Sequence, residues 1–125
     1  AFMAITITTL SSQFNDITIQ DTDVDETAKN DITQGTGAVH FIQIVNGWSG
    51  SSIFLKLYDA TSATLPTDQP MFIMKVAASG HKNCVIPDGM AFTNGLSYAA
   101  VDQNGDLGAG TPIPTGNLTV RIVTS

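Results

Sequence analysis

Apolar and polar residues alternate along most of this chain with a period of two residues, rather than with the 3.6-residue period of a helix. Such alternation is typical of β-strands that bury one face. Residues 39–45 are apolar at nearly every position, which predicts a central strand covered on both faces. In chain order, the pattern predicts eight strands, at residues 3–8, 16–20, 39–45, 53–58, 71–76, 82–86, 96–101 and 118–123.

Turn residues separate these predicted strands. Asn46-Gly47 tolerates the positive φ angles of a tight turn, and Pro87-Asp88-Gly89 has the residues of a β-turn between two strands. Sixteen Thr and nine Ser residues suit pleated, half-solvated surfaces. The sequence therefore predicts a single all-β domain over residues 1–125. Its expected form is a β-sandwich or jelly roll of about eight short strands, with a closed barrel as the alternative.

Charge is unevenly distributed in the sequence. Eleven acidic and five basic residues give a net charge of −6. Within the first 35 residues a single base, Lys29, faces six acids: Asp16, Asp21, Asp23, Asp25, Glu26 and Asp31. We expect residues 20–37, which lack the alternating pattern, to form an acidic loop or arm that contacts a partner rather than joining the core. The candidate contact residues in it are Asp21, Asp23, Asp25 and Glu26.

The charge and the hydropathy pattern also exclude several classes of partner. An acidic chain does not neutralise phosphates or anionic lipids, so we expect neither nucleic acid nor a membrane as a partner. No apolar run approaches the ~20 residues of a membrane-spanning helix, and no signal peptide is visible. A single cysteine, Cys84, cannot form an internal disulfide, which fits folding in a reducing cytoplasm.

Side chains with catalytic or metal-binding potential are few and poorly spaced. His81 and Cys84 are three residues apart on a predicted strand, so they should face opposite sides of the sheet unless a bulge intervenes. Residues 47–51 resemble the start of a nucleophile elbow but end in Ser instead of Gly. Residues 21–25 and 102–106 space their oxygen-bearing side chains like half of a calcium loop, but neither has the Glu required at the twelfth position. We therefore expect no enzyme, no metal and no cofactor.

The one tryptophan, Trp48, lies in a loop of small residues. An exposed indole there is suited to stack on a sugar or to anchor a protein interface, and an indole folded back over a sheet edge is the structural alternative. Trp48 is therefore a further candidate contact residue. A glycan-binding or host-recognition module, such as a tail-fibre domain, is the second functional hypothesis. It would use Tyr58 or Tyr98 as additional stacking surfaces and Asp102 and Asn104 as hydrogen-bonding groups.

Three segments within roughly the last seventy residues resemble a known group of proteins. They are residues 54–62 (FLKLYDATS), 70–76 (PMFIMKV) and 86–99 (IPDGMAFTNGLSYA). These segments are similar to small structural proteins of tailed bacteriophages, including cyanophages and other marine phages. The nearest group consists of capsid decoration or cement proteins. The acidic loop or arm at residues 20–37 lies outside the resemblance.

The resemblance implies a β-sandwich or jelly-roll module, usually a homotrimer, on the outside of a capsid where shell subunits meet. Its implied partner is the major capsid protein or another virion protein, and its location is the virion, assembled in the host cytoplasm. The implied function is non-enzymatic: the protein decorates the capsid and stabilises it by bridging shell subunits. No individual binding residue is carried over, because the matching segments contain core and turn positions.

Overall fold

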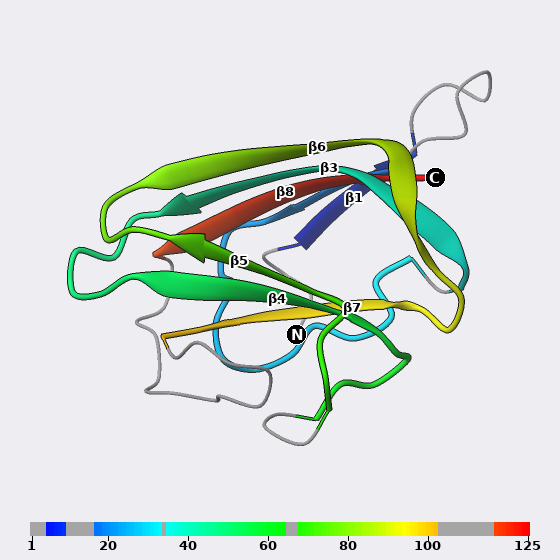
Figure 1. The fold of residues 1–125 in the computed structure, drawn as a ribbon, viewed down its shortest axis with the longest axis horizontal. Coiled ribbons are helices and arrows are strands. Elements are labelled where there is room, and N and C mark those ends of the chain that lie inside the picture. Colours follow the sequence, from blue (N-terminus) through cyan, green and yellow to red (C-terminus); the bar gives the residue numbers. More distant parts are fainter. Residues whose placement is uncertain (1–4, 10–16, 34, 65–67, 103–116) are drawn as a thin grey trace.

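A computed structural model describes residues 5–9, 17–33, 35–64, 68–102 and 117–125 (Figure 1). This part of the chain contains eight β-strands and no helix. The strands are β1 (Ile5–Thr9), β2 (Ile17–Asp21), β3 (Gly37–Asn46), β4 (Ile53–Asp59), β5 (Phe72–Val76), β6 (His81–Phe92), β7 (Leu96–Val101) and β8 (Leu118–Thr124). The predicted all-β class is confirmed, and each predicted strand overlaps one of these eight.

The strands form two antiparallel sheets. The larger sheet has the order β1-β2-β8-β3-β6, and the smaller has the order β5-β4-β7. The two sheets face each other, with the core side chains between them (Figure 1). Since the strands divide into two sheets, the alternative of a single closed barrel is wrong.

The alternation in the sequence places one row of apolar side chains across the whole inner face of the larger sheet. The aligned positions of this row are Ile7, Ile19, Ile122, Ile42 and Cys84. The three central isoleucines are fully buried, whereas Cys84 is half-buried and Ile7 is 48% exposed. The core is therefore centred on β2, β8 and β3, and it thins toward both edges of the sheet.

The burial of the two faces of β3 and β7 differs from what the sequence pattern predicts. β3 was predicted to be covered on both faces, but its outer face is open, and Val45 there is 44% exposed. That prediction is wrong, because no second layer covers the outer face of β3 within the described residues. β7 instead is buried along its whole length, on both faces.

The predicted turn at residues 87–89 lies inside β6 and does not end the strand. Pairing between β3 and β6 jumps from Val39 opposite Met90 to Phe41 opposite Val85. Four residues of β6 therefore lie opposite a single residue of β3, which is the signature of a large bulge. The prediction of a turn between two strands is wrong, because β6 pairs with β3 both before and after the bend.

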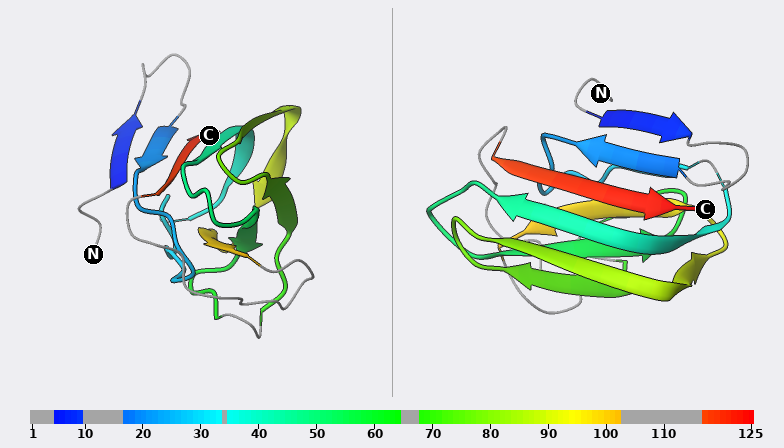
Figure 2. Two further views of the ribbon diagram at one scale, coloured as in Figure 1. Left: turned by 90° about the vertical axis from the view of Figure 1, so that its left-hand side faces the viewer. Right: turned by 90° about the horizontal axis from the view of Figure 1, so that it is seen from above.

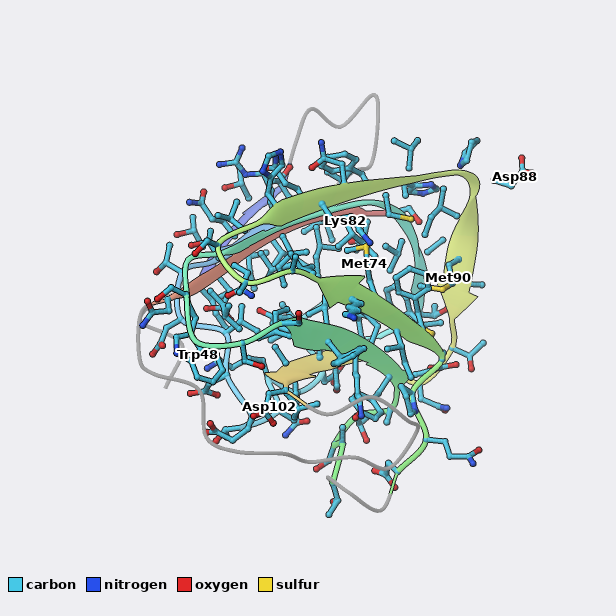
Figure 3. The ribbon with its side chains drawn as sticks, turned by 60° about the vertical axis from the view of Figure 1, so that its left-hand side comes forward. Trp48, Met74, Lys82, Asp88, Met90 and Asp102 are labelled. Atoms are coloured by element: carbon cyan, nitrogen blue, oxygen red, sulfur yellow. The ribbon has the colours of Figure 1, made fainter. Side chains whose placement is uncertain are left out.

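The bulge requires Gly89, the same residue that led the sequence to predict a turn. Gly89 has a φ of 79°, a conformation that L side chains rarely adopt. A Cβ on Gly89 would lie 2.9 Å from Cε1 of His40 on β3. Figure 3 shows Asp88 at the outside of this bend, at the opposite end of the molecule from Trp48.

Candidate functional site

The acidic segment, residues 22–36, connects β2 to β3 and runs along the edge of β7 (light blue to cyan in Figure 1). Four main-chain hydrogen bonds join it to β7: Lys29 N to Tyr98 O (2.8 Å), Tyr98 N to Lys29 O (3.0 Å), Ala100 N to Asp25 O (2.9 Å) and Ile32 N to Leu96 O (2.9 Å). The segment thereby satisfies main-chain groups that an edge strand would otherwise present to solvent.

Two apolar residues anchor the acidic segment in the core. Val24 is 1% exposed and Ile32 is 6% exposed, and both belong to the main hydrophobic cluster. The Val24 amide also donates to the Leu118 carbonyl of β8, at 3.2 Å. The expectation that the whole segment stays outside the core is therefore wrong at these two positions. They are large aliphatic residues in an otherwise polar stretch, and this was the available sequence signal.

Asp21 is the last residue of β2 and is fully buried. Its Oδ2 accepts a hydrogen bond from the Tyr98 hydroxyl at 2.8 Å, and its Oδ1 accepts one from the Asp23 amide at 2.9 Å. Burial, together with the adjacent Asp21 charge, raises the pKa of Tyr98 well above its usual range. Asp21 is therefore not a candidate contact residue, because its carboxylate is fully buried and is hydrogen-bonded inside the protein.

A second hydrogen-bonded clamp holds the far end of the acidic segment. The Asp31 amide donates to Ser97 Oγ on β7 at 2.9 Å, and that hydroxyl donates to the Ala60 carbonyl at 2.7 Å. Asp31 has a positive φ of 45°, and its Oδ1 accepts the Gly35 amide at 3.1 Å. The segment is therefore fixed at Asp21, along β7 and at Asp31.

Three candidate carboxylates remain at the surface of this fixed segment. Asp23, Asp25 and Glu26 are each half-buried. Asp25 Oδ1 accepts the Thr27 amide at 2.9 Å, and Lys29 Nζ donates to the Asp23 carbonyl at 3.4 Å. Partial burial raises the pKa of Asp25, and this effect outweighs the Thr27 hydrogen bond and the nearby Lys29 charge. These three acids form the candidate site, which we call the acidic ridge.

Trp48, the remaining candidate contact residue, lies in the turn between β3 and β4 and is half-buried. Its ring packs against the core cluster and covers Gly50, where a Cβ would lie 2.6 Å from the indole Nε1. The Trp48 amide donates to Oδ1 of the buried Asn46 at 3.0 Å. The structure therefore shows the alternative in which the indole folds back over the sheet edge.

The stacking surface of the glycan hypothesis is not assembled. Tyr58 is 1% exposed and Tyr98 is fully buried, so neither ring is available to a sugar. Burial, with the nearby Asp68 charge, raises the pKa of Tyr58 to about 12. Asp102 is half-buried at the end of β7, and Asn104 lies outside the described residues. Trp48 is thus the one aromatic ring of that hypothesis with exposed surface.

The groups considered for catalysis and metal binding also have defined places. His81 pairs with Val45 on the outer face of the larger sheet and Cys84 with the buried Ile42 on the inner face, as their spacing predicted. Within the described ranges, no group of three or more His, Cys, Asp or Glu side chains could hold a metal ion. Residues 103–106 of the second calcium-like run lie outside those ranges.

No helix in the described part of the chain is long and apolar enough to cross a membrane. In comparisons with family models, curated proteins and solved structures, nothing matches the chain. Its function must therefore be inferred from the residues and surfaces described above.

Proposed function

We propose that this chain is a non-enzymatic structural protein of a bacteriophage virion. It binds the major capsid protein or another virion protein and stabilises the shell by bridging its subunits. The observation that carries the proposal is the acidic ridge, three carboxylates on a main chain fixed to the protein body. The resemblance of residues 54–62, 70–76 and 86–99 to phage decoration proteins supplies the class of partner. A homotrimer stays a prediction of that resemblance.

We also infer that the two sheets form a jelly roll, and the strand order supports this. Without β1, the larger sheet reads β2-β8-β3-β6. The acidic segment lies beside β7, so the opposite layer reads acidic segment-β7-β4-β5. Four members in each layer, with the acidic segment in the place of a strand, give the order of a jelly roll, an architecture found in viral capsid and lectin domains.

The fixed main chain favours binding through the acidic ridge. A flexible acidic arm would lose conformational freedom on binding, and this loss would weaken the complex. Residues 22–33 are already held along β7, so little further ordering is required. Lys or Arg side chains on the shell would form charge-assisted hydrogen bonds with Asp23, Asp25 and Glu26. These acids keep exposed surface, so added salt should screen their attraction to the basic side chains of the shell and weaken the complex.

A co-sedimentation experiment with purified shells tests this proposal. The ridge variant carries Asp25→Asn and Glu26→Gln, which remove two charges while Asn keeps an acceptor for the Thr27 amide. The matched control carries Asp68→Asn and Asp88→Asn, which remove two charges elsewhere. Asp21 is left intact because it is buried. We expect the ridge variant to bind about tenfold more weakly and with less salt dependence than the control.

Two outcomes of the same experiment would contradict the proposal. If the ridge variant binds shells as tightly as the control at every salt concentration, the acidic ridge is not the contact surface. If the unmodified protein does not sediment with shells at all, the proposed function itself is wrong.

A further inference from the structure

We propose that β1 is a docking edge for a second copy of this chain. Two copies would pair antiparallel through their β1 strands, joining the two five-stranded sheets into one continuous sheet across a two-fold axis. The inference rests on the edge chemistry of the fold and does not depend on the proposed binding to a shell. The two-fold pair is an alternative to the homotrimer that the resemblance implies.

The other three sheet edges are all protected, by different means. The acidic segment occupies the edge of β7 with main-chain hydrogen bonds. β6 carries the exposed Lys82 and bends sharply at Gly89, whereas β5 follows Pro70 and carries the exposed Lys75. Charged side chains, proline and bulges are the features with which sheet proteins prevent a further strand from adding. β1 reads Ile-Thr-Ile-Thr-Thr and contains none of them.

The apolar face next to this unprotected edge is incompletely covered. Ile5 and Ile7 lie on the same side of the sheet as the fully buried Ile19, yet Ile7 is 48% exposed and Ile5 is half-buried. The cause is the unequal size of the two sheets, since β1 and β2 project past the three-stranded sheet (Figure 2, left). A strand added beside β1 would cover the exposed surface of Ile7 and pair the main-chain groups on the outer side of β1, where no further strand lies among the described residues.

A second β1 strand has the chemistry that this edge requires. In antiparallel pairing centred on Ile7, each Ile7 lies opposite its two-fold mate and each Thr6 lies opposite Thr8 of the second copy. Isoleucines and threonines then stay on their own faces throughout the joined sheet. β1 carries no charged residue, so two copies of net charge −6 can meet there without placing like charges opposite each other. The same patch is used twice, as in most two-fold dimers.

Sedimentation equilibrium of the pure protein, across a range of concentrations, tests the pairing. We expect a concentration-dependent species of twice the 13.1 kDa chain mass. Ile7→Lys should abolish it, because a charge would then lie on the two-fold axis. Val85→Lys is the matched control, since Val85 is 68% exposed on β6 at the opposite edge of the same sheet. The control should still dimerise.

A cysteine cross-link tests the same geometry without adding charge. In a Cys84→Ala background, Ile7→Cys should oxidise to a disulfide-linked dimer at least several-fold faster than Val85→Cys. Directly opposite Cα atoms of an antiparallel pair are about 4.5–5.5 Å apart, within the range that a disulfide spans. Equal rates would overturn the proposal, as would a monomer at all concentrations or a dimer or trimer that persists in Ile7→Lys.

Discussion

The buried hydrogen bond between Tyr98 and Asp21 should contribute strongly to stability. Tyr98→Phe removes the hydroxyl that donates to Asp21 Oδ2 at 2.8 Å and leaves that oxygen at a fully buried position. A hydrogen bond to a charged group contributes about 1.5–3 kcal/mol, and a buried charge that loses its partner costs more. We therefore expect Tyr98→Phe to lower the free energy of unfolding by about 2–4 kcal/mol, a large part of a typical total of about 5–15 kcal/mol.

Urea denaturation, followed by Trp48 fluorescence and by circular dichroism, measures this change. Tyr58→Phe is the matched control, because it removes a phenol hydroxyl from a buried residue on the other face of the same sheet. The control should cost about 1 kcal/mol or less. A double-mutant cycle of Tyr98→Phe with Asp21→Asn should give a coupling energy of at least about 1 kcal/mol. Equal losses in the two Phe variants, or a coupling energy near zero, would refute the reasoning.

The same pair predicts a loss of stability in alkali. The pKa of Tyr98 is raised in the folded state, so the folded protein holds this proton more tightly than the unfolded chain does. The resulting stability is fully present below the unfolded tyrosine pKa of about 10 and decreases as the pH rises above it. Between pH 10 and 11, the free energy of unfolding should therefore fall less steeply in Tyr98→Phe than in the unmodified protein.

Three further predictions concern other parts of the fold. Thr124 Oγ1 is a buried oxygen without a hydrogen-bond partner among the described residues, so Thr124→Val should raise the free energy of unfolding by about 1 kcal/mol. Gly89→Ala should lower it by about 1–3 kcal/mol, because φ is positive and the new Cβ would meet His40; an unchanged urea midpoint would contradict this. Asp59 accepts the Asn94 and Thr93 amides, and these bonds lower its pKa. Its contribution is present above pH 3.8 and lost as the pH falls through the folded value, so Asp59→Asn should show a weaker acid dependence of Tm between pH 4 and 2.

The strands could be predicted from the sequence because their signal is local. Alternation places Ile19, Ile42 and Ile122 on one face wherever the chain is extended, and their burial follows once two sheets pack. The bend at residues 87–89 was also recognised, but local sequence does not say whether pairing resumes after a bend. That depends on β3, more than forty residues away in the chain.

The acidic segment was misinterpreted for a related reason. Its charges dominate the composition, whereas Val24 and Ile32, which anchor it, are two isolated aliphatic residues eight positions apart, too few to set a strand or helix pattern. The burial of Asp21 depends on Tyr98, 77 residues later in the chain. Asp21 directly follows the predicted strand at residues 16–20 and continues the alternation of Ile17 and Ile19, which places it on their face of the sheet. Its charge was given more weight than this position, so it was grouped with Asp23, Asp25 and Glu26.

The thermal stability of shells with and without this protein is the most direct test of the proposed function. A ligand that binds only the assembled lattice raises its stability with occupancy, by RT ln(1 + [L]/Kd) for a single site. We expect shells saturated with the protein to melt at a higher temperature than bare shells, and shells incubated with the Asp25→Asn, Glu26→Gln variant at the same concentration to melt in between. Identical melting of saturated and bare shells would contradict the claim that this chain stabilises a capsid.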